Sequence, residues 1–232
     1  MGQERSLKDE LNQITQELKM RFAYEKFFVD SFILKGNQEK QKKGKSNTTD
    51  KNQLVQLLYA QVKKCRLCDI SKTKKNTVFG EGNLNAEIMF VGEAPGHDED
   101  LAGKPFVGAA GGLLTKIILA MGMKRENVYI TNVLRCRPPG NRNPQPEEVA
   151  CCRPYLIELV KIIQPKIICT LGKFAAQALL NETKPISRIR GNFFEFAGIP
   201  LMPTYHPAYL LRNPEDKKLV WQDMKKIIKF LS

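Results

Sequence analysis

The segment AEIMFVGEAPG, residues 86–96, decides the fold of this chain. Its first half holds four consecutive apolar residues, from Ile88 to Val91, which is typical of a buried strand. Its second half, from Gly92 to Gly96, is a glycine- and proline-rich loop, as expected where a strand ends. Apolar segments of the same kind recur further along the chain, so this stretch predicts the first strand of a sheet.

Three more strands are expected, at residues 127–133, at residues 166–172 and within a hairpin at residues 193–203. Helices are expected around these strands, at residues 51–64, 110–121, 147–163, 173–181 and 215–231. Strands that alternate with helices predict an α/β sandwich, in which helices flank a central sheet of four mostly parallel strands. Ligands bind such sheets beyond the carboxyl ends of the strands. The loops GEAPG, TNVLRCRPP and TYHPAY are therefore expected to meet at one edge.

The first 50 residues have a different character. Apolar residues recur every three or four positions between residues 7 and 28, which predicts a helix with one apolar face. Residues 36–50, GNQEKQKKGKSNTTD, are polar and rich in lysine, as in a linker. The expected organisation is a helical extension at 1–35, a linker at 36–50 and a domain at 51–232.

Charge indicates the class of partner. The chain has 232 residues and a net charge of +13. Residues 1–50 hold 10 basic and 8 acidic residues, so most of the excess belongs to the expected domain. A strongly basic domain favours a polyanion, most commonly nucleic acid. No apolar run approaches the roughly 20 residues of a membrane helix, and the start MGQERSLKDE is not a secretory signal. A cytoplasmic protein without a membrane partner is expected.

The cysteines indicate a metal or cluster site. The six are Cys65, Cys68, Cys136, Cys151, Cys152 and Cys169. Cytosolic thiols stay reduced, so disulfides are not expected. A Cys-x-x-Cys pair with two distant partners in a cytosolic protein is typical of a metal site. Four thiolates can hold either a [4Fe–4S] cluster or a tetrahedral zinc ion.

Four motifs in order give the chain a close resemblance to a known family. They are GEAPG at 92–96 followed by Glu99 and Asp100, GKPFVG at 103–108, NVLRCRPPGNR at 132–142 and HPAYLLRNP at 206–214. Together they resemble the family 4 uracil-DNA glycosylases, the iron–sulfur type of bacteria and archaea, although arginine is more usual where Lys104 stands. The resemblance covers about residues 55–231 and leaves the first 50 residues unexplained.

The resemblance implies hydrolysis of the N-glycosidic bond between uracil and deoxyribose in DNA, which starts base excision repair. An enzyme of this kind takes the base out of the stack into a pocket. The implied uracil-binding residues are Gly92, Glu93, Ala94, Phe106, Asn132 and His206. Backbone N–H groups of the Glu93–Ala94 loop would bind a uracil carbonyl, and Phe106 would stack on the base. The Asn132 amide would match the uracil edge and refuse cytosine.

The implied catalytic residues are Glu93, Glu99 and His206. Glu93 would position or deprotonate the attacking water. Glu99 and Asp100 are alternatives for that role, and a second role for Glu99 is to exclude the methyl group of thymine. His206 would donate a hydrogen bond to a uracil oxygen as negative charge develops there.

The resemblance also implies DNA contacts and the ligands of the cluster. Leu210 or Leu211 would wedge into the duplex, next to a phosphate-binding Arg212. The family spacing implies Cys65, Cys68, Cys136 and Cys152 as ligands of a structural [4Fe–4S] cluster, with Cys152 rather than Cys151 in the fourth place.

Rival interpretations are a catalytically silent DNA-binding or assembly module of the same fold and a relative that acts on another lesion. A protein partner of residues 1–35 is a further expectation. A redox enzyme is disfavoured because the sequence holds no nucleotide or flavin fingerprint.

Overall fold

The computed structural model describes residue 15 and residues 47–180 and 183–232. The helix expected at 7–28, apart from Thr15, and the linker up to residue 46 lie outside the described residues. Residues Thr48–Ser232 form one compact unit, which contains every one of the predicted site residues. In this part of the chain, no helix combines the length and the apolar character that crossing a membrane requires.

The centre of the unit is a sheet in the order β1-β3-β2-β4-β6-β5. Its strands are β1 (Glu81–Gly82), β2 (Ile88–Gly92), β3 (Tyr129–Asn132), β4 (Ile167–Leu171), β5 (Phe194–Phe196) and β6 (Ile199–Thr204). The four inner strands are parallel, as predicted from the sequence. The two short outer strands, β1 and β5, add antiparallel edges, so the sheet has six strands where four were predicted. Strand β5 forms with β6 the hairpin that was predicted at residues 193–203.

The long helices match the predicted ones closely. They are α3 (Asn47–Lys64), α6 (Ala109–Ala120), α7 (Pro146–Ile163), α8 (Lys173–Leu180) and α11 (Lys217–Leu231). The start of α3 differs most, because it includes four residues assigned to the linker; Asn and Thr in that stretch are residues that favour helix starts. Short helices that the sequence did not predict are α4 (Ile70–Thr73), α5 (His97–Ala102), α9 (Ile186–Ile189) and α10 (Pro207–Arg212). Short 3-10 helices cover Arg125–Asn127, Pro139–Asn141 and Pro214–Asp216.

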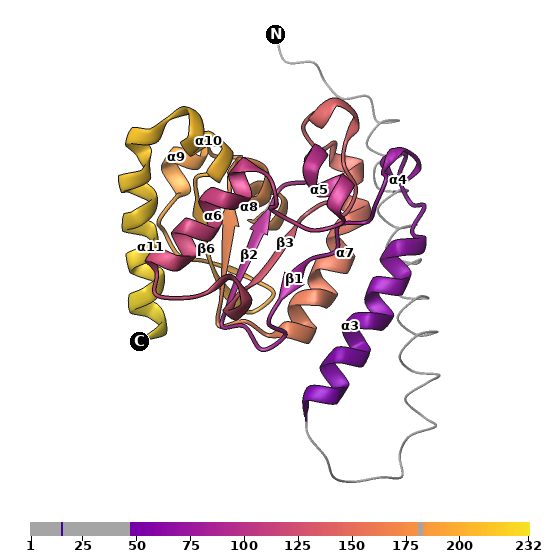
Figure 1. Cartoon of the computed structure of the whole chain (residues 1–232), viewed down its shortest axis with the longest axis horizontal. Coiled ribbons are helices and arrows are strands. Elements are labelled where there is room, and N and C mark those ends of the chain that lie inside the picture. Colours follow the sequence, from indigo (N-terminus) through magenta and orange to yellow (C-terminus); the bar gives the residue numbers. More distant parts are fainter. Residues whose placement is uncertain (1–14, 16–46, 181–182) are drawn as a thin grey trace. The chain divides into compact units, whose positions relative to one another are not determined.

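Helices cover both faces of the sheet (Figure 1). Successive residues of β2 point to opposite faces, so Met89 and Val91 join one apolar cluster and Ile88 and Phe90 join the other. The first cluster includes side chains of α3, α7 and α8, and the second includes side chains of α6, α10 and α11. All five residues of β2 are buried, which explains why its sequence is a continuous apolar run.

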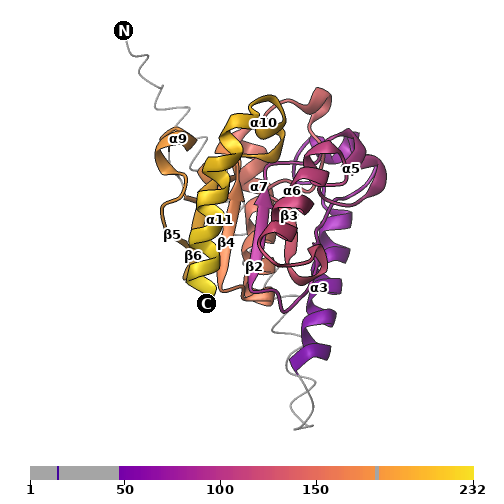
Figure 2. The same ribbon diagram turned by 60° about the vertical axis from the view of Figure 1, so that its left-hand side comes forward.

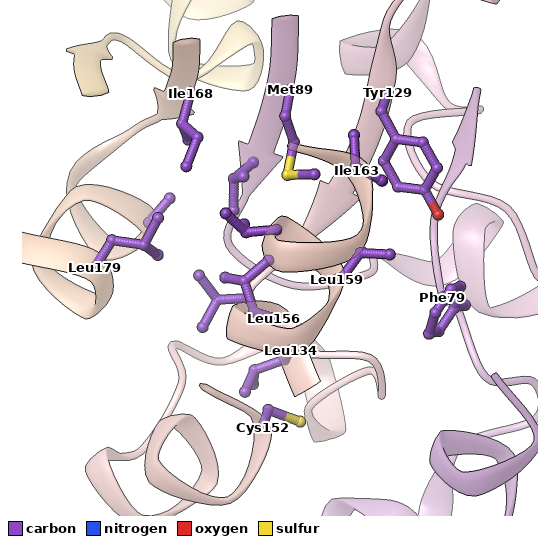
Figure 3. Close-up of a cluster of buried hydrophobic side chains, with 14 of the residues drawn as sticks. Phe79, Met89, Tyr129, Leu134, Cys152, Leu156, Leu159, Ile163, Ile168 and Leu179 are labelled. Atoms are coloured by element: carbon purple, nitrogen blue, oxygen red, sulfur yellow. The ribbon is translucent and has the colours of Figure 1, made fainter. Parts of the chain in front are cut away.

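Helix α7 provides much of the first cluster. Figure 3 shows Met89, Tyr129 and Ile168, from three neighbouring strands, packed with Leu156, Leu159 and Ile163 of this helix, of which Ile163 lies beside the Tyr129 ring. This packing fixes the strands relative to one another and so fixes where their carboxyl ends lie. Figures 1 and 2 show α5 and α10, which follow β2 and β6, at the same end of the molecule.

Candidate active site

The carboxyl ends of the parallel strands bring three of the predicted site residues together. Gly92 at the end of β2 is in register with Asn132 at the end of β3. His206 comes two residues after the end of β6. Gly172, which follows β4 with a φ of +91°, packs against His206: a Cβ at this glycine would lie 2.9 Å from the Cβ of the histidine.

Gly92 lies against two side chains of the predicted pocket. A Cβ placed on Gly92 would be 2.3 Å from Oδ1 of Asn132 and 2.6 Å from Cζ of Phe106. Contacts this short do not occur between real atoms, so the pocket requires glycine here. Gly92, Phe106 and Asn132 are therefore direct neighbours, as the sequence motifs implied.

Phe106 is held in an unusual backbone conformation. Its φ is +52°, in the left-handed region that non-glycine residues rarely adopt. Its ring stacks on the imidazole of His206, with a distance of 5.6 Å between ring centroids and an angle of 30°. Strained conformations of this kind persist only where the surroundings enforce them, and they concentrate at functional sites.

Two residues outside the predicted set of site residues enforce the position of Phe106. Gly111 of α6 packs on its backbone: a Cβ on Gly111 would be 1.8 Å from the carbonyl oxygen of Phe106. Nη2 of Arg125 donates a hydrogen bond of 2.7 Å to the carbonyl oxygen of Pro105 and pairs with Glu81. The only sequence signal was the glycine pair at 111–112, which is equally typical of a helix start.

Glu99 organises the loops on both sides of itself. Its Oε1 accepts hydrogen bonds of 3.0 Å from the backbone N–H groups of Val107 and Gly108. Its Oε2 accepts one of 3.1 Å from the N–H of Gly96. Both carboxylate oxygens are thus engaged by backbone groups, so Glu99 ties the GEAPG loop to the segment that follows Phe106.

Asp100 faces away from this pocket. It is buried, and its Oδ1 accepts hydrogen bonds from the backbone N–H groups of Lys75 and Asn76, at 3.0 and 3.1 Å. A carboxylate engaged in this way holds the segment before β1. It is poorly placed to share the activation of water with Glu93, which was one of the alternatives left by the sequence.

Glu93 has a carboxyl group of different character. Within the described residues its side chain forms no hydrogen bond or ion pair, and burial raises its pKa from 4.5 to about 7. Removal from water disfavours the charged form, which explains the direction. A carboxyl group with a pKa near neutrality is suited to accept a proton from water.

His206 has a defined tautomer. Its Nδ1 accepts a hydrogen bond of 3.0 Å from the backbone N–H of Ala208 at the start of α10, so the ring proton is on Nε2. Burial lowers the pKa of the imidazole to about 4; Glu99 opposes this shift and Arg212 adds to it. The histidine is therefore a neutral N–H donor at physiological pH.

Asn132 offers an unused acceptor. Its side chain is buried, with 2% of its surface exposed, and no group of the described residues donates to its Oδ1. Leaving a buried polar atom without a partner costs about 1–3 kcal/mol. Such an atom beside the Phe106 ring indicates a place where a ligand donates a hydrogen bond.

The two leucines of the predicted wedge have different environments. Leu210 is fully buried in the second apolar cluster, so it is not available to enter DNA. Leu211 is 46% exposed, and the side chain of Arg212 beside it is also exposed. Of the two leucines, Leu211 is therefore the one whose side chain is accessible for the predicted role.

The predicted cluster ligands act on one another electrostatically. Cys136 and Cys152 are buried, and burial raises the pKa values of their thiols to about 11 and about 12. Charge on Cys68 raises both pKa values further, which indicates that these three sulfurs lie near one another. Charge on Cys65 also raises the pKa of Cys136. Among the described residues, however, no three cysteine, histidine or carboxylate side chains are arranged to hold a metal ion.

Cys151 lies beside the same group. Its thiol donates to the carbonyl oxygen of Leu67 at 3.3 Å. A hydrogen bond between the two thiols lowers the pKa of Cys68 to about 7, so thiolate forms readily at this position. Cys151 thus contacts the Cys65–Cys68 loop without being one of the predicted ligands.

Two cations accompany the thiols. Arg135 is completely buried, and its guanidinium is attracted to charge on Cys136 and Cys152. Its Nη1 donates to Thr131 and, at 2.8 Å, to the carbonyl oxygen of Asn132, while no acceptor in the described part of the chain reaches Nε or Nη2. Lys74 lies next to Cys136 and lowers its pKa, against the effect of burial. Sulfur-only donors with buried cations beside them fit a cofactor that carries negative charge.

The sequence that places these residues at the carboxyl edge of the sheet matches a family of known proteins. The chain belongs to the uracil DNA glycosylase superfamily, whose family model matches residues 79–225. Within the superfamily it is similar to type-4 uracil-DNA glycosylases. It is 50% identical to the one from Archaeoglobus fulgidus over 175 residues, which cover 72% of this chain and 88% of the relative. It is 43% identical to the one from Thermotoga maritima over 185 residues, or 78% and 96% of the two chains.

A type-5 uracil-DNA glycosylase from Pyrobaculum aerophilum is more distant, at 32% identity over 149 residues that cover 57% of this chain and 66% of the relative. The resemblance first seen in four motifs is thus confirmed at the level of the type-4 family.

Proposed function

We propose that this protein hydrolyses the N-glycosidic bond of deoxyuridine in DNA and releases free uracil, the first step of base excision repair. The observation that carries the proposal is the buried, unpartnered Oδ1 of Asn132, next to Gly92 and Phe106 at the carboxyl edge of the sheet. Membership of the type-4 family supports the same reaction.

Recognition of the base rests on three groups. Oδ1 of Asn132 accepts the N3–H of uracil, and the amide nitrogen donates to O4. Cytosine has no hydrogen on N3 and carries an amino group at position 4, so it offers the reverse pattern and is refused. Phe106 provides an aromatic face, and stacking on it contributes about 1–3 kcal/mol per base. Backbone N–H groups of the Gly92–Ala94 loop bind a uracil carbonyl.

Hydrolysis needs a base and a stabilised leaving group. Glu93, whose pKa is about 7, accepts a proton from the water that attacks the sugar C1′. The electrons of the broken bond stay on uracil, which leaves as an anion. Nε2–H of His206 donates to the uracil oxygen where this charge develops, and it stabilises the transition state without transferring its proton.

Glu99 supports the reaction through the loops it joins. Its oxygens hold Gly96, Val107 and Gly108, so it positions the Glu93 loop and the Phe106 segment relative to each other. This favours Glu93 over Glu99 for activating water. Exclusion of the thymine methyl group remains a second role for Glu99.

DNA outside the pocket is contacted from α10. Leu211 fills the gap that the flipped nucleotide leaves, and Arg212 binds a neighbouring phosphate. Single-stranded DNA needs no wedge, so these residues matter more on duplex substrates.

A [4Fe–4S] cluster held by Cys65, Cys68, Cys136 and Cys152 is part of the proposal. The donor set of four thiols and the cations Arg135 and Lys74 beside them support it. The cluster would supply structural cross-linking, joining the loop after α3 to the loop after β3 and to α7. A cytoplasmic location, where thiols stay reduced, suits such a cofactor. The roles of residues 1–35 as an extension with a protein partner and of the linker that follows stay predictions.

Uracil release from an oligonucleotide with one deoxyuridine tests the proposal. Asn132→Ala and His206→Ala should each reduce the single-turnover rate on the order of 100-fold, as loss of a transition-state hydrogen bond does. Asn192→Ala, at an exposed asparagine outside the pocket, is the matched control and should keep the wild-type rate. A wild type that releases no uracil would favour the silent DNA-binding module instead.

The same sample tests the cofactor. A brown protein with broad visible absorption supports the iron–sulfur cluster. A colourless protein that contains zinc would refute it.

A further inference from the structure

A basic cleft lies outside the proposed uracil site. A cleft of about 560 Å³ is formed by the end of α3, by α4 with the segment after it, and by the residues that follow α5. The cations that line it are Lys63, Arg66, Lys72, Lys74, Lys75 and Lys104. No acidic side chain is among the described residues that line this cleft. Figure 1 shows α3, α4 and α5 on one side of the molecule.

The positive charge of the cleft is largely uncompensated. Lys63, Lys75 and Lys104 are exposed, and no carboxylate in the described part of the chain pairs with them. Lys72 pairs with Asp69 at 2.7 Å, but both side chains are strongly exposed, where such pairs contribute little. Nζ of Lys74 is buried beside the thiol of Cys136, so this lysine adds to the positive potential of the cleft from below its surface. Like charges gathered around a concave surface favour an anionic ligand.

The chain connects the cleft directly to the pocket. Lys104 lines the cleft, and Phe106, two residues later, stacks on His206 in the proposed uracil site. Two residues span at most about 7 Å. A DNA strand with its flipped base at Phe106 therefore has neighbouring phosphates within reach of Lys104, and then of the other cations. Lysine contacts of this kind bind phosphates in any sequence.

We infer that this cleft binds the phosphodiester backbone of the DNA strand beside the flipped nucleotide, as a second binding site separate from the uracil pocket. The inference rests on the proposed function, since the pocket defines where the strand enters. It also gives the Cys65–Cys68 loop a role in DNA binding, because Arg66 lies within this loop and α4 follows it directly.

The salt dependence of DNA binding tests the inference. The probe is a fluorescein-labelled single strand of about 20 nucleotides without uracil, because each phosphate that a cation neutralises on a single strand adds about 0.7 to the slope of log K against log salt. Lys63→Gln/Lys75→Gln should therefore lower the slope by about 1.4. Between about 50 and 200 mM salt, the wild type should then lose roughly 7-fold more affinity than the variant.

A double variant on α11, Lys225→Gln/Lys229→Gln, removes the same charge from exposed lysines outside the cleft and should keep the wild-type slope. An equal fall in slope for both variants, or no fall for either, overturns the inference.

Uracil release from a trinucleotide with central deoxyuridine separates this result from the proposed function. The trinucleotide has phosphates only beside the flipped nucleotide, next to Lys104, and is too short to extend to Lys63 and Lys75. The wild type and Lys63→Gln/Lys75→Gln should therefore release uracil from it at equal rates. An unchanged slope together with normal release overturns the cleft alone. Absence of release by the wild type refutes the glycosylase, while a lowered slope still supports the cleft.

Discussion

Replacing Gly111 with alanine should displace the backbone of Phe106 and so reduce the rate of uracil release. A Cβ at this position would lie 1.8 Å from the carbonyl oxygen and 2.1 Å from the carbonyl carbon of Phe106. These are backbone atoms, so they cannot rotate away as a side chain could. The segment that holds Phe106 must shift by more than 1 Å to reach ordinary van der Waals contact.

The size of the effect follows from that shift. Displacing a group in an active site by about 1 Å costs on the order of 100-fold in rate. Overpacking costs about 1–3 kcal/mol of stability, and roughly 1 kcal/mol returns because alanine favours a helix more than glycine does. Gly111→Ala should therefore lose most of its activity while losing at most about 2 kcal/mol of stability.

The next residue provides the control. A Cβ on Gly112 would meet nothing within 4 Å, and this glycine is exposed in the same helix turn. Gly112→Ala should keep the wild-type rate and gain about 0.5–1 kcal/mol in stability. Single-turnover uracil release and thermal unfolding measure both variants. Wild-type activity in Gly111→Ala, or an equal loss in Gly112→Ala, would refute the reasoning.

Three further predictions concern other parts of the site. The kcat/KM of the wild type should fall as the pH drops through about 7, where Glu93 becomes protonated. Glu93→Gln should lose this limb and gain stability above pH 7, because a carboxyl whose pKa is raised on folding destabilises the folded state once it ionises; a pH–rate profile that keeps the limb would exclude Glu93 as the base. Leu210→Ala should cost about 2–5 kcal/mol in thermal unfolding. Leu211→Ala should leave stability unchanged and slow release only from duplex DNA; similar stability losses in the two variants would contradict their opposite burial. Arg135→Met should reduce iron content and visible absorbance, because Lys74 beside Cys136 is then the one cation of the pair left to oppose the charge on Cys136 and Cys152; full iron content in this variant would rule out that role.

The strands and long helices were predictable because their signals are local. Four apolar residues at 88–91 or a regular apolar spacing along α7 suffice to predict a buried strand or a helix. The hairpin of β5 and β6 was predicted, but the edge strand β1 was not: it has two residues and gains its pairing from β3, which is distant in sequence. Helix α5 begins in a motif loop, where the carboxylate of Glu99 caps it while also holding the Phe106 segment.

Within the site, the sequence motifs identified the residue set but not the direction of each side chain. Leu210 and Leu211 are adjacent in a helix, where each residue is turned by about 100° from the next, so one is buried and the other exposed. Glu93 and Glu99 are both glutamates of the same motif, so the sequence does not say which of them activates water. The structure separates their roles, because a backbone N–H group donates to Glu99, whereas burial raises the pKa of Glu93. Arg135 looks like one more basic residue in a basic chain until its complete burial is seen.

Arg135 also connects the thiol group to the strand end that carries Asn132. Its guanidinium donates to the carbonyl oxygen of Asn132, while the next residue is Cys136. The same Nη1 donates to the carbonyl oxygen of Phe79, so one guanidinium holds the end of β3 and the segment before β1 together while it faces the thiols. A substitution at position 135 therefore acts on the thiol group and on the strand end that carries Asn132 at the same time.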